Sequence, residues 1–172
     1  MSISLHDVSV VAFRQVLAGV AGFLEKGRTH CAAVGIDTGD LVAARLAPDM
    51  YPLRFQIAAV AHHSLGALRG IEAGVFGPPN VPELDYAGLQ GLIAEAQAGL
   101  SAYTPETVNA LTGRDVEFRL GDNRIPFIAE HFVLSFSLPN LHFHATTAYD
   151  LLRMKGVPLG KRDYLAQLRV KR

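Results

Sequence analysis

Three stretches of the chain carry apolar residues at the spacing of an α-helix, and this periodicity constrains the fold most strongly. The first stretch, Val8 to Leu24, repeats apolar side chains every three or four residues and predicts a helix that ends near Gly27. Similar stripes predict a second helix, from an N-cap at Asp49 to about Glu72, and a third helix after Asp85. Because each stripe covers only one face, the helices must pack against one another.

The pattern changes after the third helix. Thr104 followed by Pro105 predicts a short further helix. The segment VEFRL, a turn around Gly121, and a second stretch that continues through HFVLSF predict an antiparallel hairpin, in which Pro126 suits an edge strand. A last long helix is expected to begin near Pro139 with Ser137 as its cap, and to stop at Gly156; residues 29–35 are expected to form only a short extra turn.

Together these elements predict a mainly α protein: one domain over residues 1–172, built as a four-helix bundle with a small β-hairpin before the last helix. A chain of 172 residues is long enough to bury a sizeable core. Hydrophobic residues make up 49% of the chain and charged residues 19%, which is typical of a folded protein.

Charge and cysteine usage exclude several classes of function. Sixteen basic residues balance sixteen acidic ones, so no net field attracts nucleic acid or an anionic membrane, and we expect neither as a partner. The basic C-terminal residues are interpreted as a solvated end. The single cysteine, Cys31, excludes an internal disulfide and fits a reducing compartment, and MSISLHDVSV does not resemble a signal peptide. We therefore expect a cytoplasmic protein.

Two histidines are the candidate metal ligands. On the last helix, a turn of about 100° per residue places His144 on the same face as Asn140, while His142 lies on another side. On the second helix only His63, not His62, falls on the apolar stripe. His63 and His144 are thus predicted to meet inside the bundle, with Asn140 beside them.

The alternative interpretation needs no metal. Two imidazoles and an amide make an incomplete set, because a catalytic zinc usually has three strong protein ligands. The pair would then be two core histidines that hydrogen-bond to each other or to water. No phosphate-binding loop, nucleophile elbow or dinucleotide fingerprint is present, and the His30–Cys31 pair is adjacent on a predicted helix, where neighbours do not face each other.

Two segments carry a resemblance to a known family. RLAPDMYPL, from Arg45 to Leu53, and HATTAYDLLRMKGVPLGKRDYL, from His144 to Leu165, resemble the bacterial domain-of-unknown-function family DUF1993, which is placed among the DinB/YfiT-like four-helix bundles. The resemblance covers nearly the whole chain and implies a DinB-like bundle, often a homodimer. Better-known DinB-like members bind nickel or zinc through one histidine on the second helix and two on the last.

By position, His63 resembles the second-helix ligand and His144 the downstream ligand of the last helix, whereas Asn140 replaces the upstream ligand. Two readings follow. The protein is either a metal-dependent enzyme, or a degenerate relative of one, that acts on a small molecule or thiol, or it is a metal-free dimeric bundle with a small-molecule-binding or structural role. Since one strong donor is missing, we expect nickel or zinc to bind weakly or not at all.

Overall fold

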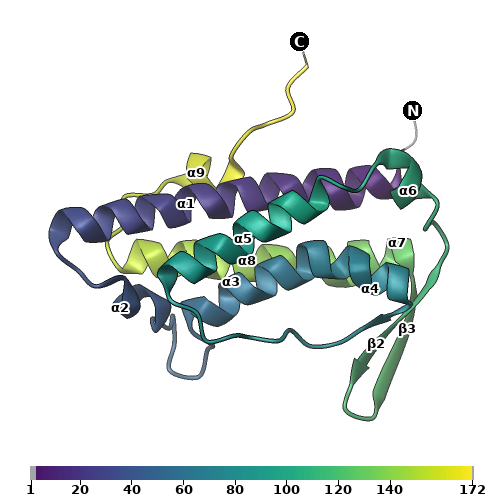
Figure 1. The fold of residues 1–172 in the computed structure, drawn as a ribbon, viewed down its shortest axis with the longest axis horizontal. Helices are drawn as coiled ribbons and strands as arrows, with labels where there is room; N and C mark the ends of the chain where they lie inside the picture. The colour runs from purple at the N-terminus through teal and green to yellow at the C-terminus, as the bar shows by residue number, and fades with distance from the viewer. Residues whose placement is uncertain (1–2, 172) are drawn as a thin grey trace.

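The computed structural model describes residues 3–171 and confirms a mainly α fold built as a helical bundle. Figure 1 shows α1 and α5 side by side in one layer and the α3–α4 helix beside α8 in the other, with a hairpin projecting from one end. The helices of the bundle are α1 (Ala12–Val34), α3 (Leu53–Ala61) continued by α4 (Ala67–Ala73), α5 (Tyr86–Leu100) and α8 (Leu138–Met154).

The first helix is longer than predicted. A π-helical turn, η1 (Asp7–Val11), leads into α1, which runs through Gly27 and the supposed extra turn to Val34 and ends at Gly35, whose φ is 73°. Placing its end near Gly27 was wrong. A Cβ at Gly27 would lie 2.3 Å from the hydroxyl oxygen of Tyr86, so this glycine allows α5 to approach α1 closely instead of ending the helix.

By length and composition the helix Asp7–Val34 could also cross a membrane, although half of its most apolar stretch is buried inside the bundle. Core residues on this helix, such as Phe13, Leu17 and Phe23, are fully buried against the other helices. This is the burial expected of the core helix in a soluble bundle.

The second long helix begins later than predicted. Asp49 is not its N-cap, because α3 starts at Leu53 after Pro52. The residue before a proline is disfavoured in helical conformation, so Tyr51 cannot be part of the helix. Between α3 and α4 lies a π-helical turn, η2 (His62–Gly66), and the whole helix ends at Gly74 with φ of 72°, close to the predicted end.

Two helices begin at the residues that the sequence marked as their starts. Asp85 accepts a hydrogen bond from the Gly88 amide at the start of α5, and Thr104 caps α6 (Pro105–Asn109), as predicted. Two further short helices, α2 (Thr38–Val42) and α9 (Lys161–Leu165), were not predicted. Lys26 pairs with Asp163 at 2.6 Å and so fixes α9 against α1.

The hairpin is one part of a small three-stranded sheet. Strands β2 (Asp115–Leu120) and β3 (Asn123–Ile128) are antiparallel, and β1 (Val75–Phe76), which was not predicted, pairs in parallel with β2. The strand order β1-β2-β3 leaves β3 and its Pro126 at an edge of the described sheet, as expected.

The second strand was predicted to be too long. HFVLSF is helical: α7 (Ala129–Phe132) and the π-helical turn η3 (Val133–Ser137) continue directly into α8. Ser137 is therefore buried inside this helix and does not cap it. The β-branched and aromatic residues of HFVLSF favour a strand locally, but packing against the bundle overrides that preference. The widened turn just before Pro139 also accommodates a residue that cannot donate a backbone hydrogen bond.

Candidate functional site

His63 and His144 come from two helices that are far apart in sequence and packed together in space. His63 lies in η2 and is only 5% exposed, while His144 lies in α8 and is partly buried. Their ring centroids are 5.8 Å apart and the ring planes are inclined by 14°. No direct hydrogen bond joins these two described side chains, so the rings face each other without satisfying each other's nitrogens.

The tautomer of His144 follows from its contact with a buried glutamine. Gln56 donates its amide to the carbonyl of Tyr51 at 2.9 Å, and its Oε1 lies 2.8 Å from His144 Nδ1. Because an amide oxygen only accepts, Nδ1 of His144 must carry the proton in this contact. The lone pair of the neutral ring is therefore on Nε2, the arrangement seen when a second residue orients a ligating histidine.

His63 has the opposite situation, because its Nδ1 atom is buried without any hydrogen-bond partner among the described residues. Burial, followed by the charges of His62 and His144, lowers the pKa of His63 to about 3. Burial also lowers the pKa of His144 to about 4. Both imidazoles are neutral at physiological pH, so protons do not compete with a metal ion or another electrophile for their lone pairs.

Two of the three π-helical turns found within residues 3–171 meet at this pair. His63 belongs to η2, and Ser137, the last residue of η3, donates its hydroxyl to the His63 carbonyl at 2.7 Å. A π-turn shifts the backbone hydrogen-bonding pattern, which leaves a carbonyl in need of another partner. Such turns are frequent at functional sites, and here they set the position of His63 relative to α8.

The surroundings of the pair are aromatic and carry no formal charge. Phe76 and Phe136 pack on His63 with ring centroids at 5.5 and 5.8 Å, and Phe55 and Phe143 meet His144 at 5.7 and 5.3 Å. His62 stacks on Phe76 and contacts the Gly77 carbonyl through Nε2 at 2.7 Å. Since a carbonyl accepts, His62 Nε2 carries the proton in that contact. This nitrogen is therefore engaged with the Gly77 carbonyl, and we assign His62 a supporting role beside the pair.

Asn140 is on the same helix as His144 but is engaged elsewhere. Its side-chain nitrogen donates to the carbonyl of Phe136 at 2.7 Å, one turn earlier. The amide thus supports the backbone of η3, and only its oxygen stays available as an acceptor. A ligand role for Asn140 remains a prediction.

Comparisons with known proteins agree with this architecture. Residues 5–165 match the family described as a domain of unknown function, DUF1993. The chain belongs to the DUF1993 family. A crystal structure of a DinB family member protein from Shewanella denitrificans is 25% identical, covers 98% of this chain and 95% of its own, and superposes with a TM-score of 0.77. No curated protein matches the chain.

The donor set of this DUF1993 chain is incomplete for a tightly held metal. Within residues 3–171, no group of three or more His, Cys, Asp or Glu side chains is arranged to hold an ion. His63 and His144 are nonetheless nitrogen donors of the kind that nickel and zinc prefer, and Nδ1 of His63 has no hydrogen-bond partner among the described residues. A metal at this pair stays a prediction, and such an ion would need to take its remaining ligands from water or a small molecule.

The other candidates have structural explanations. His142 turns away from the pair, as predicted, and its Nδ1 lies 3.1 Å from the hydroxyl of Tyr164. Cys31 is buried, and burial raises the pKa of its thiol. Sequence reasoning missed the roles of Gln56 and Ser137. A polar residue on the buried stripe of the second helix was the available signal for Gln56, whereas the sequence marked Ser137 only as a helix cap.

Proposed function

We propose that this DUF1993 protein binds a divalent metal ion, nickel or zinc, through His63 and His144, and leaves the other coordination positions to a small molecule. One observation carries the proposal: a buried imidazole nitrogen without a partner lies next to a second, oriented imidazole. Leaving such a polar atom unsatisfied costs about 1–3 kcal/mol, so an external partner would stabilise the site.

The protein's own residues prepare the site for that partner. Gln56 holds the His144 ring in one tautomer, and Ser137 holds the backbone of His63. The phenyl rings packed on the pair lower the local dielectric. A metal bound there would lower the pKa of a coordinated thiol or water, which favours a small thiol or an electrophile as the substrate class.

The cellular context and assembly belong to the same proposal. We infer a cytoplasmic protein because the fold is that of a soluble bundle and Cys31 is an unpaired thiol. A homodimer is supported by the family resemblance alone. Light scattering on the eluting peak should give about twice the chain mass of 18.5 kDa, and a value near 18.5 kDa would contradict the dimer.

Calorimetric titration of tag-free protein with nickel and zinc tests the metal proposal. We expect one site per chain with micromolar affinity, lost in His63→Ala and in His144→Ala. His142→Ala is the matched control, because it removes an imidazole from the same helix that does not contact the pair. Retention of binding in both ligand variants, or its loss in His142→Ala, would contradict the assignment.

A metal-free small-molecule-binding bundle is the second candidate. Two observations favour it: the pair has only two strong donors, and the Asn140 amide donates to its own helix. A ligand that binds only the folded state must raise the melting temperature. If added nickel and zinc leave that temperature unchanged and calorimetry shows no heat of binding, this second function replaces the first.

A further inference from the structure

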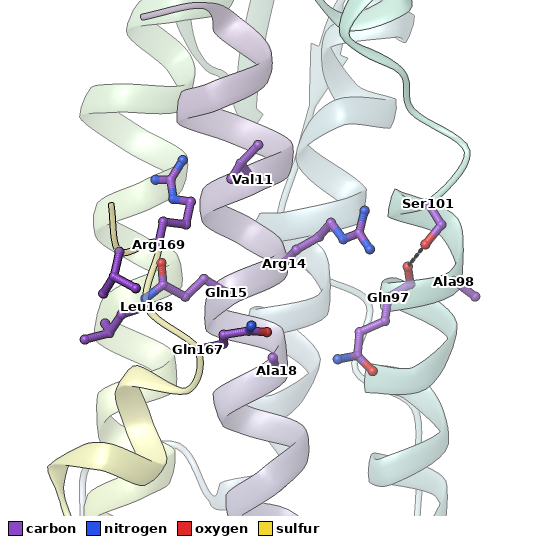
Figure 2. A pocket seen from close by; sticks show the side chains of 11 residues that line it. Val11, Arg14, Gln15, Ala18, Gln97, Ala98, Ser101, Gln167, Leu168 and Arg169 are labelled. Carbon is purple, nitrogen blue, oxygen red and sulfur yellow. Dashed lines mark hydrogen bonds between the residues drawn. The ribbon is translucent and has the colours of Figure 1, made fainter. Parts of the chain in front are cut away.

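A cavity lies on the layer formed by α1 and α5, away from the histidine pair. The residues that line it differ in kind from those around the pair. The cavity occupies about 720 Å³ between α1, α5 and the C-terminal segment that follows α9, within the size range of small-molecule sites. Figure 2 shows α1 in the middle of this cavity, with Arg14 projecting toward α5 and Arg169 on the side of the C-terminal segment.

The cavity is cationic. Arg14 and Arg169 line it together with no acidic residue, and neither arginine forms a salt bridge with a described side chain. Asp7, an acidic residue close enough for Arg169 to influence its pKa, has a carboxylate oxygen that already accepts hydrogen bonds from the amide and hydroxyl of Ser4. Both guanidinium groups are thus free to donate to an anion.

Amides and apolar side chains complete the lining. Gln97 and Gln167 can offer N–H donors, while Val11, Ala18 and Leu168 provide apolar surface. The hydroxyl of Ser101 donates to the Gln97 carbonyl, as drawn in Figure 2. Cationic donors at both sides of an apolar floor are complementary to a molecule with an acidic group and an apolar body.

The C-terminal segment is anchored to α1 as far as Leu165. Gln15 donates to the Leu165 carbonyl at 3.0 Å, and a Cβ at Gly19 would lie 2.4 Å from the Tyr164 carbonyl oxygen, so α9 sits directly on α1. Ala166 then turns with φ of 51°, a conformation unfavourable for a residue other than glycine. After this turn Gln167 to Val170 contribute to the lining of the cavity, and Leu168 and Val170 stay 55% and 70% exposed.

We propose that this cavity binds a small amphipathic organic anion, independently of the histidine pair. The acidic group, a carboxylate, phosphate or sulfonate, accepts hydrogen bonds from one of the two arginines, Arg14 or Arg169, and is attracted electrostatically by the other. The apolar body lies on Val11, Ala18 and Leu168. The two sites belong to different layers of the bundle, so each can be altered without the other (Figure 1).

The test uses the fluorescent anion 1-anilinonaphthalene-8-sulfonate with the full chain. We expect saturable binding of one molecule per chain, weakened about tenfold in Arg14→Gln and in Arg169→Gln and more in the double variant. Arg28→Gln is the control on the same helix, because Arg28 pairs with Glu25 and lies outside the cavity. Near-ultraviolet circular dichroism verifies that each variant is folded.

Competition and resonance assignment locate the binding and define the ligand class. Octanoate and phenyl phosphate should displace the probe, whereas 1-octanol, which lacks the charge, should not. The side-chain amide resonances of Gln97 and Gln167 should shift on binding, and His63→Ala should leave the affinity unchanged. Equal binding by the arginine variants, displacement by 1-octanol, or shifts confined to other residues would each overturn the proposal, whatever the outcome at the histidine pair.

Discussion

The histidine pair and the cationic cavity show how one bundle can offer two chemically opposite environments. The pair lies between α3–η2 and α8, where both helices contain or adjoin π-turns and the neighbours are aromatic. The cavity lies over the end of η1, over α1 and over α5, and its lining combines two arginines and polar side chains with apolar ones. The pair offers a buried, largely aromatic environment, whereas the cavity presents two arginines near solvent.

The largest expected difference between the two regions is in their response to pH. His63 and His144 have folded-state pKa values of about 3 and about 4, below the ordinary 6.5, so the unfolded chain binds more protons in the interval between. Stability is then complete above about pH 6.5 and is lost as the pH falls. From about pH 7.5 to about pH 5 we expect the free energy of unfolding to drop by about 2–4 kcal/mol.

Urea denaturation at several pH values measures this drop. The double variant His63→Gln/His144→Gln should lose most of the dependence, with a remainder from His62 and His142, whose pKa values burial also lowers. Arg14→Gln/Arg169→Gln should keep the full dependence. An unchanged pH profile in the histidine double variant would show that the two rings are not held neutral by burial.

Two glycines on α1, Gly19 and Gly22, allow the packing beside the cavity to be changed without changing the histidine pair. Gly19→Ala places a methyl group against the Tyr164 carbonyl, so we expect a loss of about 1–3 kcal/mol in stability together with weaker binding of the sulfonate probe. Nickel affinity at the histidine pair should stay the same. Gly22→Ala, with no atom within 4 Å of the new Cβ, should instead stabilise by about 0.5–1 kcal/mol.

Thermal and urea melts of both glycine variants provide the measurement. If Gly19→Ala stabilises the protein as much as Gly22→Ala does, the close contact between α1 and α9 is wrong, and with it the anchor of the C-terminal segment.

Ser137→Ala gives the smallest expected effect and acts only on the histidine side. Losing the hydroxyl leaves the His63 carbonyl without this donor, which we expect to cost about 1 kcal/mol of stability and to weaken nickel binding. Ser101→Ala removes an exposed bond at the cavity and should change stability by less than about 0.5 kcal/mol. Equal effects of the two substitutions in urea melts would argue against a supporting role for Ser137.

The sequence predicted the parts of the fold that depend on local signals. The apolar stripes located the bundle helices, and Asp85 and Thr104 marked two helix starts through capping hydrogen bonds made within a few residues. It could not show that Gly27 faces Tyr86, because that contact joins separate helices. Nor could it show that HFVLSF is helical, because tertiary packing decides between helix and strand there.

The same distinction applies to the candidate site. Helical spacing predicted that His63 and His144 face inward, because that prediction needs only the residues of one helix at a time, and their rings do lie together. Their partners Gln56 and Ser137 depend on how two helices meet and on the π-turns, which no spacing rule predicted. The supporting contacts were therefore found only in three dimensions.

Anomalous diffraction from crystals of tag-free protein soaked with nickel tests the histidine pair most directly. We predict one strong peak at the nickel edge, about 2.1 Å from a nitrogen of His63 and from a nitrogen of His144. A peak bound elsewhere on the chain, or no peak between these rings at full soak, would contradict the assignment of this pair as a metal site.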